Sequence, residues 1–451
     1  MILTTWNVYR NPQRERAALI DFRDQELRRL VGSAYGQVPF YRNWFDAAGV
    51  LPGDIRRAED LVALPLLSKS DLKNAPLESR LARGSDPAKL VFHNTAGSTG
   101  EPFTIYRRHA EEDLLQLFRV RAARQYGVRF RDRRVDLTGS ESGGPKGPLR
   151  HAAKTLRLAQ VESLDITRDT SDLLREVARS KPDVLTGYPG VLSNIAREAA
   201  SCRKFLIRPR IVIAGGEPMD PLMRSRIKHE FNAPVYDMYG TSEFNLLAWQ
   251  CPESKHFHVC DDNVIVEILS DGEPVEEGEQ GEVVVTGLFS RTMPFIRYRT
   301  GDLAIRGAEV CGCGQPFSTL GAIQGRTVDY LRLPDGRLVH PFAVVTGFAE
   351  FGDSWIDQHQ LVQTAPDRVV LRVKLRRTAT PDELERLISA GEKACRPARF
   401  ELEFVDHLEL DPSGKFRSYL GLDDVRRLKH ARSSRPESAQ TRVVPTTTGK
   451  K

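Results

Sequence analysis

The sequence predicts an α/β protein with a large N-terminal domain, in which helices flank mixed or parallel sheets, an antiparallel subdomain, and a small α+β C-terminal domain. Between residues 134 and 243, strand-like runs alternate with helical patterns, which is typical of a parallel sheet covered by helices. Between 264 and 299, runs of alternating apolar and polar residues follow one another closely, as antiparallel strands do. Beyond 326, hairpin and helix-capping signals indicate a second, smaller unit.

The composition bounds the class of protein. A chain of 451 residues is too long for one ordinary domain, and 40% hydrophobic with 28% charged residues is typical of globular proteins. No run approaches the roughly 18 apolar residues of a membrane span. Met1 to Ile20 carry charges throughout and lack the apolar core of a signal peptide. We therefore expect a cytoplasmic protein without a membrane span.

A net charge of +6 is compatible with a nucleic-acid partner if the basic residues form one face, so we asked where in the chain the charge lies. Residues 426–451 hold eight Lys or Arg against one Glu, a net charge of +7, which leaves −1 for the rest of the chain. Few apolar residues accompany this charge, so we expect a basic disordered tail at 431–451. Without a basic face in the body of the chain, we expect no nucleic-acid partner.

The individual elements follow from local patterns. Helices are expected within 1–80, above all at 14–31, and a break at 38–41 ends that pattern. Further helices are expected at 111–126, 170–179 and 193–200, and another follows Pro218 and ends at about Phe231. Strands are expected at 134–138, 183–186, 210–214, 234–238 and 296–299. In the smaller unit we expect a hairpin at 329–339, strands at 360–364, 368–374 and 401–405, and a helix opened by a capping box at Thr380.

Small and polar residues gather where ligands bind in such folds. Thr95 to Gly100 lie between two strand-like runs and include two glycines and no bulky side chain, so this loop can wrap phosphate oxygens or be a plain surface turn. It lacks the Gly-Lys-Ser/Thr of a Walker loop. Two expected strands end in Gly215-Gly216-Glu217 and in Tyr239 to Glu243, at the sheet edge where ligands collect.

Three of the six cysteines and two histidines suggest a structural zinc site. Cys311 and Cys313 are one residue apart, and Cys251 precedes His256 and His258. Three thiolates and one imidazole would complete a closed tetrahedral set. His258 is the expected fourth ligand and His256 the alternative. The alternative interpretation is that these thiols are unrelated and bind no metal.

Five motifs in this order resemble those of the adenylate-forming enzymes. They are Thr95-Ala-Gly-Ser-Thr-Gly-Glu-Pro102, Tyr239-Gly-Thr-Ser-Glu243, Tyr298-Arg-Thr-Gly-Asp302, Gly325-Arg326 and Ser413-Gly-Lys415. The chain is most similar to the phenylacetate–CoA ligase branch and related capsular polysaccharide biosynthesis proteins. The resemblance extends over residues 15–425 and implies a large AMP-binding domain at 1–326 and a small mobile domain at 327–430.

The resemblance implies a role for each matching residue. The residues implied to bind ATP are Thr95, Ala96, Gly97, Ser98, Thr99, Gly100, Gly215, Gly216, Glu217, Tyr239, Gly240, Ser242, Asp302 and Arg326. The Thr95 loop would hold the β- and γ-phosphates, Thr241 or Ser242 the α-phosphate, and Glu243 a Mg²⁺ ion. Tyr239 would lie on the adenine and Asp302 would accept from the ribose hydroxyls. Gly215 to Glu217 would line the adenine and acyl pockets.

Lys415 is implied to catalyse the first half-reaction, with its ammonium bridging the attacking carboxylate and the α-phosphate. The family usually has an acidic hinge residue two places after Arg326. Here Val328 takes that place and Asp329 follows, so either Asp329 is the hinge or rotation works differently.

The function implied is activation of a carboxylic acid by ATP, followed by transfer to CoA. The alternatives are transfer to an amine, hydroxyl or carrier thiol in polysaccharide or natural-product synthesis, and a non-catalytic nucleotide-binding protein. Intact Glu243, Asp302 and Lys415 argue against the last. A homodimer is compatible with the sequence, and the acid, which could be an aryl acid such as phenylacetate, is not identified by it.

Overall fold

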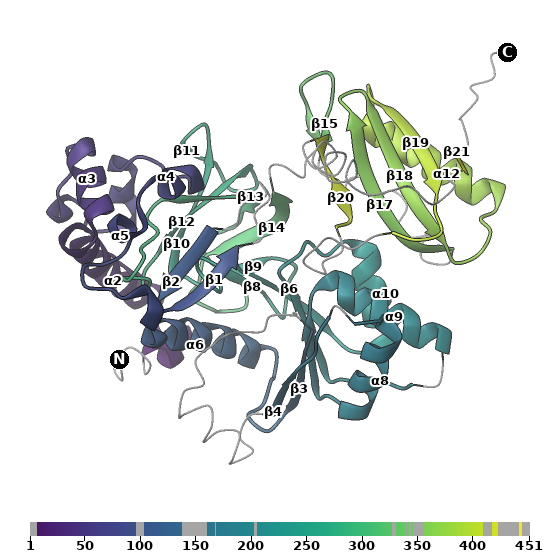
Figure 1. Ribbon diagram of the computed structural model, residues 1–451, viewed down its shortest axis with the longest axis horizontal. Coiled ribbons are helices and arrows are strands. Elements are labelled where there is room, and N and C mark those ends of the chain that lie inside the picture. The colour runs from purple at the N-terminus through teal and green to yellow at the C-terminus, as the bar shows by residue number, and fades with distance from the viewer. Residues whose placement is uncertain are drawn as a thin grey trace.

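The computed structural model describes residues 7–95, 103–137, 160–166, 168–202, 205–326, 331–339, 341, 344–345, 355–408, 417–422 and 442–443. Two sheet-containing parts are visible in Figure 1, a larger one that runs from the N-terminus to β14 and a smaller one that contains β17 to β21. The α/β class and the small C-terminal α+β part are as predicted. The boundaries at 326 and 430 stay predictions, because 327–330 and most residues after 422 lie outside the described ranges.

Helices form the N-terminal end of the larger part. α2 (Arg16–Gln37) and α3 (Pro39–Ala48) meet at Val38, the break expected there, and Pro39 opens α3 because proline lacks only an N–H that the first turn does not use. α4 (Lys69–Asn74) begins with a capping box from Ser68, and α5 (Leu77–Arg80) follows. The 3₁₀ turns are Asn11–Gln13, Pro52–Asp54, Ala58–Ala63 and Pro87–Lys89.

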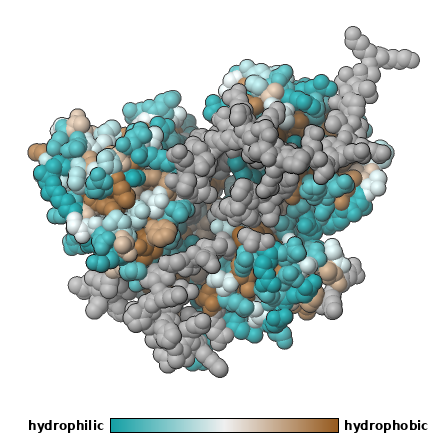
Figure 2. Space-filling view, viewed as in Figure 1, coloured by the Kyte–Doolittle hydropathy of each residue, from teal (hydrophilic) through white to brown (hydrophobic). Residues whose placement is uncertain are grey.

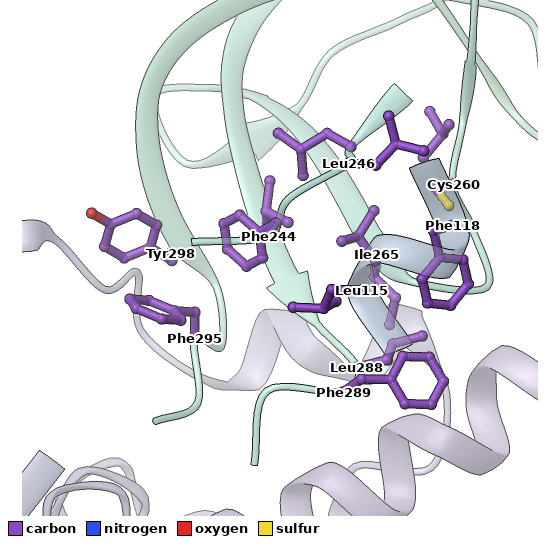
Figure 3. Close-up of a cluster of buried hydrophobic side chains, with 14 of the residues drawn as sticks. Leu115, Phe118, Phe244, Leu246, Cys260, Ile265, Leu288, Phe289, Phe295 and Tyr298 are labelled. Atoms are coloured by element: carbon purple, nitrogen blue, oxygen red, sulfur yellow. The ribbon is translucent and has the colours of Figure 1, made fainter. Parts of the chain in front are cut away.

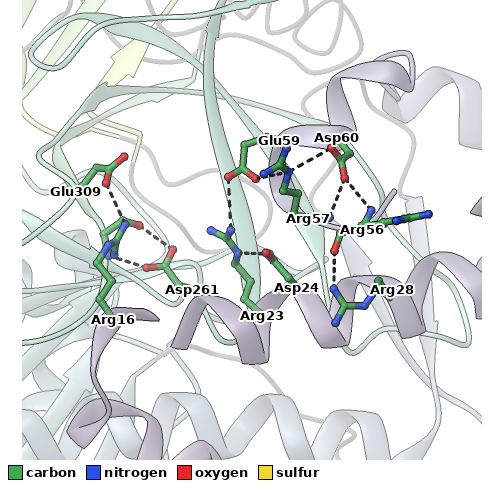
Figure 4. A network of polar contacts seen from close by, with 11 residues as sticks. Arg16, Arg23, Asp24, Arg28, Arg56, Arg57, Glu59, Asp60, Asp261 and Glu309 are labelled. Atoms are coloured by element: carbon green, nitrogen blue, oxygen red, sulfur yellow. Dashed lines mark hydrogen bonds and ion pairs between the residues drawn. The ribbon is translucent and has the colours of Figure 1, made fainter. Parts of the chain in front are cut away.

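Polar contacts attach α2 to its surroundings (Figure 4). Arg16 donates to the carbonyl oxygen of Pro316 at 3.0 Å and lies 3.7 Å from the carboxylate of Glu309. Arg23 forms ion pairs with Asp24 and Glu59 at 3.0 and 3.8 Å. The first long helix is thereby fixed to a loop 300 residues later in the chain.

A twelve-stranded sheet is the centre of the larger part of the described chain, in the order β11-β10-β12-β13-β14-β9-β8-β7-β6-β5-β3-β4. Its parallel strands are β3 (Arg133–Leu137), β4 (Gln160–Ser163), β5 (Val184–Gly187), β6 (Ile211–Gly215) and β7 (Val235–Tyr239). The helices around them are α6 (His109–Gln125), α8 (Thr170–Ser180), α9 (Pro189–Cys202) and α10 (Pro221–Phe231). The predicted alternation of strands and helices is confirmed.

The antiparallel strands predicted within 264–299 are present as β10 (Val264–Ser270), β12 (Gln280–Gly287) and β13 (Tyr298–Arg306), and they continue the same sheet. Four further strands of the described chain, which were not predicted, belong to this half: β8 (Ala248–Gln250), β9 (Phe257–Val259), β11 (Glu273–Pro274) and β14 (Thr319–Arg326). β8 and β9 connect them to the parallel half, which the sequence did not indicate. The strand expected at 296–299 begins at Tyr298 and runs to Arg306, because pairing with β14 extends it.

The strand-like runs around the Thr95 loop form a hairpin of their own. β1 (Val91–Thr95) pairs with β2 (Phe103–Arg107) in an antiparallel two-stranded sheet, with Val91 opposite Arg107. In the view of Figure 1 this hairpin overlaps the antiparallel half of the large sheet.

A cluster of buried hydrophobic side chains includes Phe244, which directly follows the Tyr239–Glu243 turn (Figure 3). Phe244 meets Phe295 and Tyr298 at ring-centroid distances of 5.7 and 6.2 Å, and Phe118 of α6 meets Phe289 at 5.6 Å. All five rings are buried. Aromatic contacts of this kind stabilise both by area and by edge-to-face attraction, so they anchor the end of the turn.

The smaller part has its own five-stranded sheet, in the order β20-β17-β18-β19-β21. The elements are β17 (Ile356–Ala365), β18 (Arg368–Leu375), α12 (Pro381–Cys395), β19 (Arg399–Phe404), β20 (Tyr419–Leu420) and β21 (Arg442–Val443), preceded by the hairpin β15 (Leu331–Arg332) and β16 (Leu338–Val339). Thr380 accepts from the Glu383 N–H and Glu383 accepts from the Thr380 N–H, so the predicted capping box is confirmed.

Hydrophilic side chains cover much of the described surface in the view of Figure 2, with apolar residues between them. Among the helices of the described ranges, none combines the length and the apolar character that a membrane crossing requires.

Candidate active site

The polar strand ends predicted from the sequence share one edge of the large sheet. β5, β6 and β7 are parallel neighbours, with Gly187 beside Ala214 and Gly215 beside Met238. Gly215-Gly216-Glu217 and Tyr239 to Glu243 leave the sheet from the carboxyl ends of β6 and β7. Two of the predicted segments are therefore brought together, at the edge where ligands of such folds bind.

The turn after β7 is tight and internally bonded. A Cβ on Gly240 would lie 1.9 Å from the Asn245 carbonyl oxygen, so only glycine fits there. The Thr241 carbonyl accepts from the Asn245 N–H at 2.8 Å. The hydroxyl oxygen of Thr241 is buried, and among the described residues it has no hydrogen-bond partner. A buried hydroxyl without a protein partner is suited to hydrogen bonding with a ligand.

Asp302 lies against this turn. The Tyr239 hydroxyl donates to Asp302 Oδ2 at 2.6 Å, although 63 residues separate them. Asp302 is buried on β13, and its partner across the strand pair is Arg326 on β14. Three of the five sequence motifs therefore meet at one place. The side chain of Arg326 lies outside the described part.

Glu243 points one carboxylate oxygen at Tyr298, whose hydroxyl donates to Oε1 at 3.2 Å. The residue is buried. Within the described ranges, Oε2 accepts no hydrogen bond and no cationic side chain forms an ion pair with this carboxylate. The side chain thus keeps an oxygen for a hard cation.

The two glycines after β6 are required by close packing within the protein itself. Gly216 has φ +80°, and a Cβ there would lie 2.8 Å from the Tyr188 ring; a Cβ on Gly215 would lie 2.5 Å from the Met238 carbonyl oxygen. Glu217 Oε2 accepts from the Gly190 N–H at the start of α9, at 3.2 Å. Close packing of adjacent strand ends is therefore sufficient reason for both glycines.

The sequence reasoning assigned no role to four residues near this edge: His93, Arg107, Glu112 and Tyr298, although Tyr298 opens one of the quoted motifs. Arg107 donates to Glu112 at 3.1 Å and to the carbonyl oxygens of Ser242 and Glu243. Burial lowers the pKa of the Arg107 guanidinium against the opposing effect of Glu112. Burial would raise the pKa of Glu112, but hydrogen bonding from His93 and the charge of Arg107 lower it to about 2. The inward register of Phe103 and Ile105 could have revealed Arg107 as a buried charge.

Asp237 lies two residues before Tyr239 on β7. Burial raises its pKa to about 6, although Arg224, 3.9 Å away, and the Met238 N–H act in the opposite direction.

Several predicted residues lie outside the described ranges. They are Ala96, Gly97, Ser98, Thr99, Gly100, Val328, Asp329 and Lys415, and of Thr95 only the backbone is described. Their roles stay predictions.

The predicted metal ligands gather in a second cluster, between β8, β9 and the loop before β14. One ligand atom from each of Cys251, His258, Cys311 and Cys313 lies within 4.8 Å of all the others. The Cys251 and Cys311 sulfurs are 3.8 Å apart, and His258 Nε2 is 3.4 Å from the Cys313 sulfur. His256 Nε2 lies 2.9 Å from the Cys311 sulfur but outside this four-residue set.

The donor set of this cluster fits zinc. Two sulfurs that are each about 2.3 Å from one tetrahedral ion are about 3.8 Å apart. Three thiols and one imidazole are also the donors that zinc prefers in closed sites.

Known proteins match this chain over most of its length. Residues 148–291 match the family model described as AMP-binding enzyme. The phenylacetate-coenzyme A ligase of Thermus thermophilus is 28% identical over 414 residues, which cover 88% of this chain and 87% of that protein. The phenylacetate-coenzyme A ligase of Aromatoleum evansii is 30% identical over 306 residues, 64% of this chain and 67% of that protein.

A solved structure shares the fold. The 2-hydroxyisobutyryl-CoA ligase in its postadenylation state superposes with a TM-score of 0.77 over 94% of both chains, at 21% identity. The predicted fold class is therefore confirmed. On the identity and coverage of its relatives, the chain belongs to the phenylacetate–coenzyme A ligase family of adenylate-forming enzymes and is an ATP-dependent acid–thiol ligase that forms AMP and pyrophosphate.

Proposed function

We propose that this ligase activates an aryl acid such as phenylacetate and transfers the acyl group to CoA. In the first step a carboxylate oxygen bonds to the α-phosphorus of ATP and pyrophosphate leaves with the electrons of the broken P–O bond. In the second step the CoA sulfur bonds to the acyl carbon, AMP leaves, and the thiol proton passes to solvent. The aryl class is inferred from the names of the relatives.

The observation that carries the proposal is the contact between Tyr239 and Asp302 at the carboxyl edge of the sheet. It holds a carboxylate beside an aromatic ring, as a nucleoside site requires: carboxylate oxygens accept from ribose hydroxyls, and a ring face stacks on a base. The Thr241 hydroxyl, buried without a partner among the described residues, supports contact with the α-phosphate. We assign the same roles to the residues outside the described ranges as the family resemblance implies, with Lys415 in the first step.

Mg²⁺ is the expected metal of the nucleotide, and Glu243 is the residue that would hold it. A bound Mg²⁺ supplies neutralisation of phosphate charge. Glu243 itself is kept in place by the Tyr298 hydroxyl and by its own buried backbone. Within the described ranges its second oxygen accepts no hydrogen bond, so this oxygen is available to a hard cation.

Zinc is the proposed occupant of the second cluster, held by Cys251, His258, Cys311 and Cys313. The set of four protein donors leaves no open position, so the role would be structural. It would join the segment that follows the Glu243 turn to the loop that follows Asp302.

The proposal is tested by acid-dependent exchange of labelled pyrophosphate into ATP over a panel of aryl and aliphatic acids, then by product formation with and without CoA. We expect exchange with an aryl acid and a CoA thioester only when CoA is added. Asp302→Ala should lower exchange about 10- to 100-fold through lost charged hydrogen bonds, whereas Asp335→Ala, in an exposed turn, should leave it unchanged. Exchange without any thioester would favour another acceptor. No exchange with any acid would overturn the proposal.

We further place the enzyme in the cytoplasm, where ATP and CoA are available, and include a homodimer among the states to be tested by light scattering.

A further inference from the structure

The hairpin β1–β2 is not hydrogen-bonded into the large sheet. Its strands pair with each other, and within the described strands neither joins a third. Backbone pairing therefore does not fix the hairpin relative to β7 and the Glu243 turn. Side chains must do so.

Three residues of β2 are buried at alternate positions: Phe103, Ile105 and Arg107. The first two are apolar and pack in the main core. Arg107 is equally buried, with 2% of its surface exposed. A buried guanidinium costs several kcal/mol unless its donors are satisfied, so a cation in this register requires compensation.

The compensation comes from two directions. Arg107 Nη1 donates to Glu112 Oε2 at 3.1 Å, and Nη2 donates to the carbonyl oxygen of Glu243 at 2.6 Å and to that of Ser242. Glu112 is in turn bonded to His93 Nε2 at 3.0 Å and to Gln116 Nε2 at 3.0 Å. A chain of polar contacts thus runs from β1 through α6 and β2 to the turn after β7.

Arg107 forms its ion pair with Glu112, and its hydrogen bond to Glu243 is to the backbone carbonyl rather than to the carboxylate. The charge of Glu243 opposes the lowering of the Arg107 pKa by burial, and the charge of Glu112 does so more strongly. The guanidinium therefore fixes where the Glu243 backbone lies and leaves its carboxylate available. A direct ion pair would fix the position but would compete with a metal for the same oxygens.

We infer that Arg107 is a positioning residue for magnesium-bound nucleotide: it holds the Ser242–Glu243 backbone in place, and Glu112 and His93 hold Arg107. This inference rests on the proposed function, because it takes Glu243 as the residue that faces Mg²⁺. It assigns no contact between Arg107 and the substrate. The consequence is specific, since a displaced Glu243 should weaken MgATP more than AMP, which carries no β- and γ-phosphates to recruit the ion.

The test compares Arg107→Met, Glu112→Gln and Arg121→Met by calorimetric binding of MgATP and of AMP, together with thermal melting. Arg121→Met is the matched control, because Arg121 is also 2% exposed and paired with a carboxylate, Asp262, but contacts none of the turn. We expect Arg107→Met to weaken MgATP binding about 10- to 100-fold, as loss of charged hydrogen bonds does. The affinity for AMP should change less than about threefold, because AMP has no β- and γ-phosphates to recruit the ion. Arg121→Met should lower the melting temperature and leave the ratio of the two affinities unchanged.

Arg107→Lys, which keeps the charge and can reach one carbonyl, should restore part of the MgATP affinity. If Arg107→Met does not fold, Glu112→Gln decides, since it keeps the shape of the side chain and removes its charge; it should shift the MgATP to AMP ratio in the same direction. An unchanged ratio in a folded variant, or equal loss of both ligands, would overturn the inference. Failure of the proposed function shows differently: wild-type protein that binds MgATP but exchanges no pyrophosphate with any acid.

Discussion

At the scale of single residues, some side chains of the site position the carboxylates of Glu243 and Asp302, and these carboxylates are the groups proposed to contact the ligand. Tyr298 and Arg107 contact Glu243 through one carboxylate oxygen and through the backbone, and Tyr239 contacts Asp302. Glu243 Oε1 and Asp302 Oδ2 each accept a hydrogen bond from a tyrosine hydroxyl, which orients the two carboxylates at the site.

Lys415 is the residue whose loss should affect one step only. Lys415→Ala should lower acid-dependent ATP–pyrophosphate exchange about 100-fold or more, because a transition-state charge contact is lost. Conversion of a supplied acyl adenylate to product should remain close to wild type. Lys393→Ala, on α12 of the same part, serves as the control for loss of a lysine. Unchanged exchange in Lys415→Ala would remove this residue from the mechanism.

Asp237 should make stability depend on pH in a direction unusual for a carboxylate. Its pKa is raised to about 6 by burial, so its contribution to stability is complete below about pH 4, the range of an unfolded aspartate, and is lost as pH rises through 6. Asp237→Asn removes this loss. From pH 5 to pH 8 the unfolding free energy of the variant should gain about 1 kcal/mol relative to wild type.

Urea unfolding of both proteins at the two pH values measures this difference, and effects of the substitution that do not depend on pH cancel. A constant difference between variant and wild type would show that Asp237 ionises as an ordinary aspartate.

At the scale of elements, the zinc cluster should connect β8 and β9 to the loop before β14. Purified protein should contain about one zinc per chain, as a four-ligand site holds, and Cys311→Ser should lose the metal and melt at a lower temperature. Cys202→Ser, an exposed cysteine outside the cluster, should keep it. His258→Ala should lose zinc and His256→Ala should retain it. Wild-type protein without zinc, or the reverse result for the two histidines, would contradict the assignment.

The elements that sequence patterns could predict are those with local causes. The helix after Thr380 was predictable because its capping box is contained in four residues, and the ends of β6 and β7 because glycines follow apolar runs. The junction made by β8 and β9 was not, because each is three residues long and its pairing is set by distant strands. The distant partners of Arg107 were unpredictable for the same reason, because Ser242 and Glu243 lie about 135 residues away.

At the scale of the whole molecule, polar contacts hold the smaller part against the larger one. Arg226 of α10 donates to the backbone carbonyls of Asp357 and Ile356 at 2.8 and 3.1 Å. Gln358 donates to Asn194 of α9 at 2.8 Å, and Arg197 pairs with Asp357 at 3.3 Å. These contacts lie where β17 meets α9 and α10 (Figure 1). Leu222 of α10 adds an apolar contact, because it packs in the core of the smaller part. The hydrogen bonds and ion pairs are of the kind that water can replace at small net cost.

The family resemblance implies that the two parts separate between the two steps, and the predicted hinge is where this sequence departs from the family pattern. If Asp329 serves as the hinge, Asp329→Pro, which restricts φ and removes a backbone donor, should trap the smaller part in one orientation. Adenylation should survive and the second half-reaction should fall sharply, since only that step requires Lys415 to withdraw. Val328→Asp restores the acidic residue at its usual place and should be tolerated or faster. Single-turnover kinetics of each half-reaction measures both variants. Equal loss in the two steps for Asp329→Pro would indicate misfolding or a hinge elsewhere, and no loss in either would mean that rotation about residues 328 and 329 is not part of the cycle.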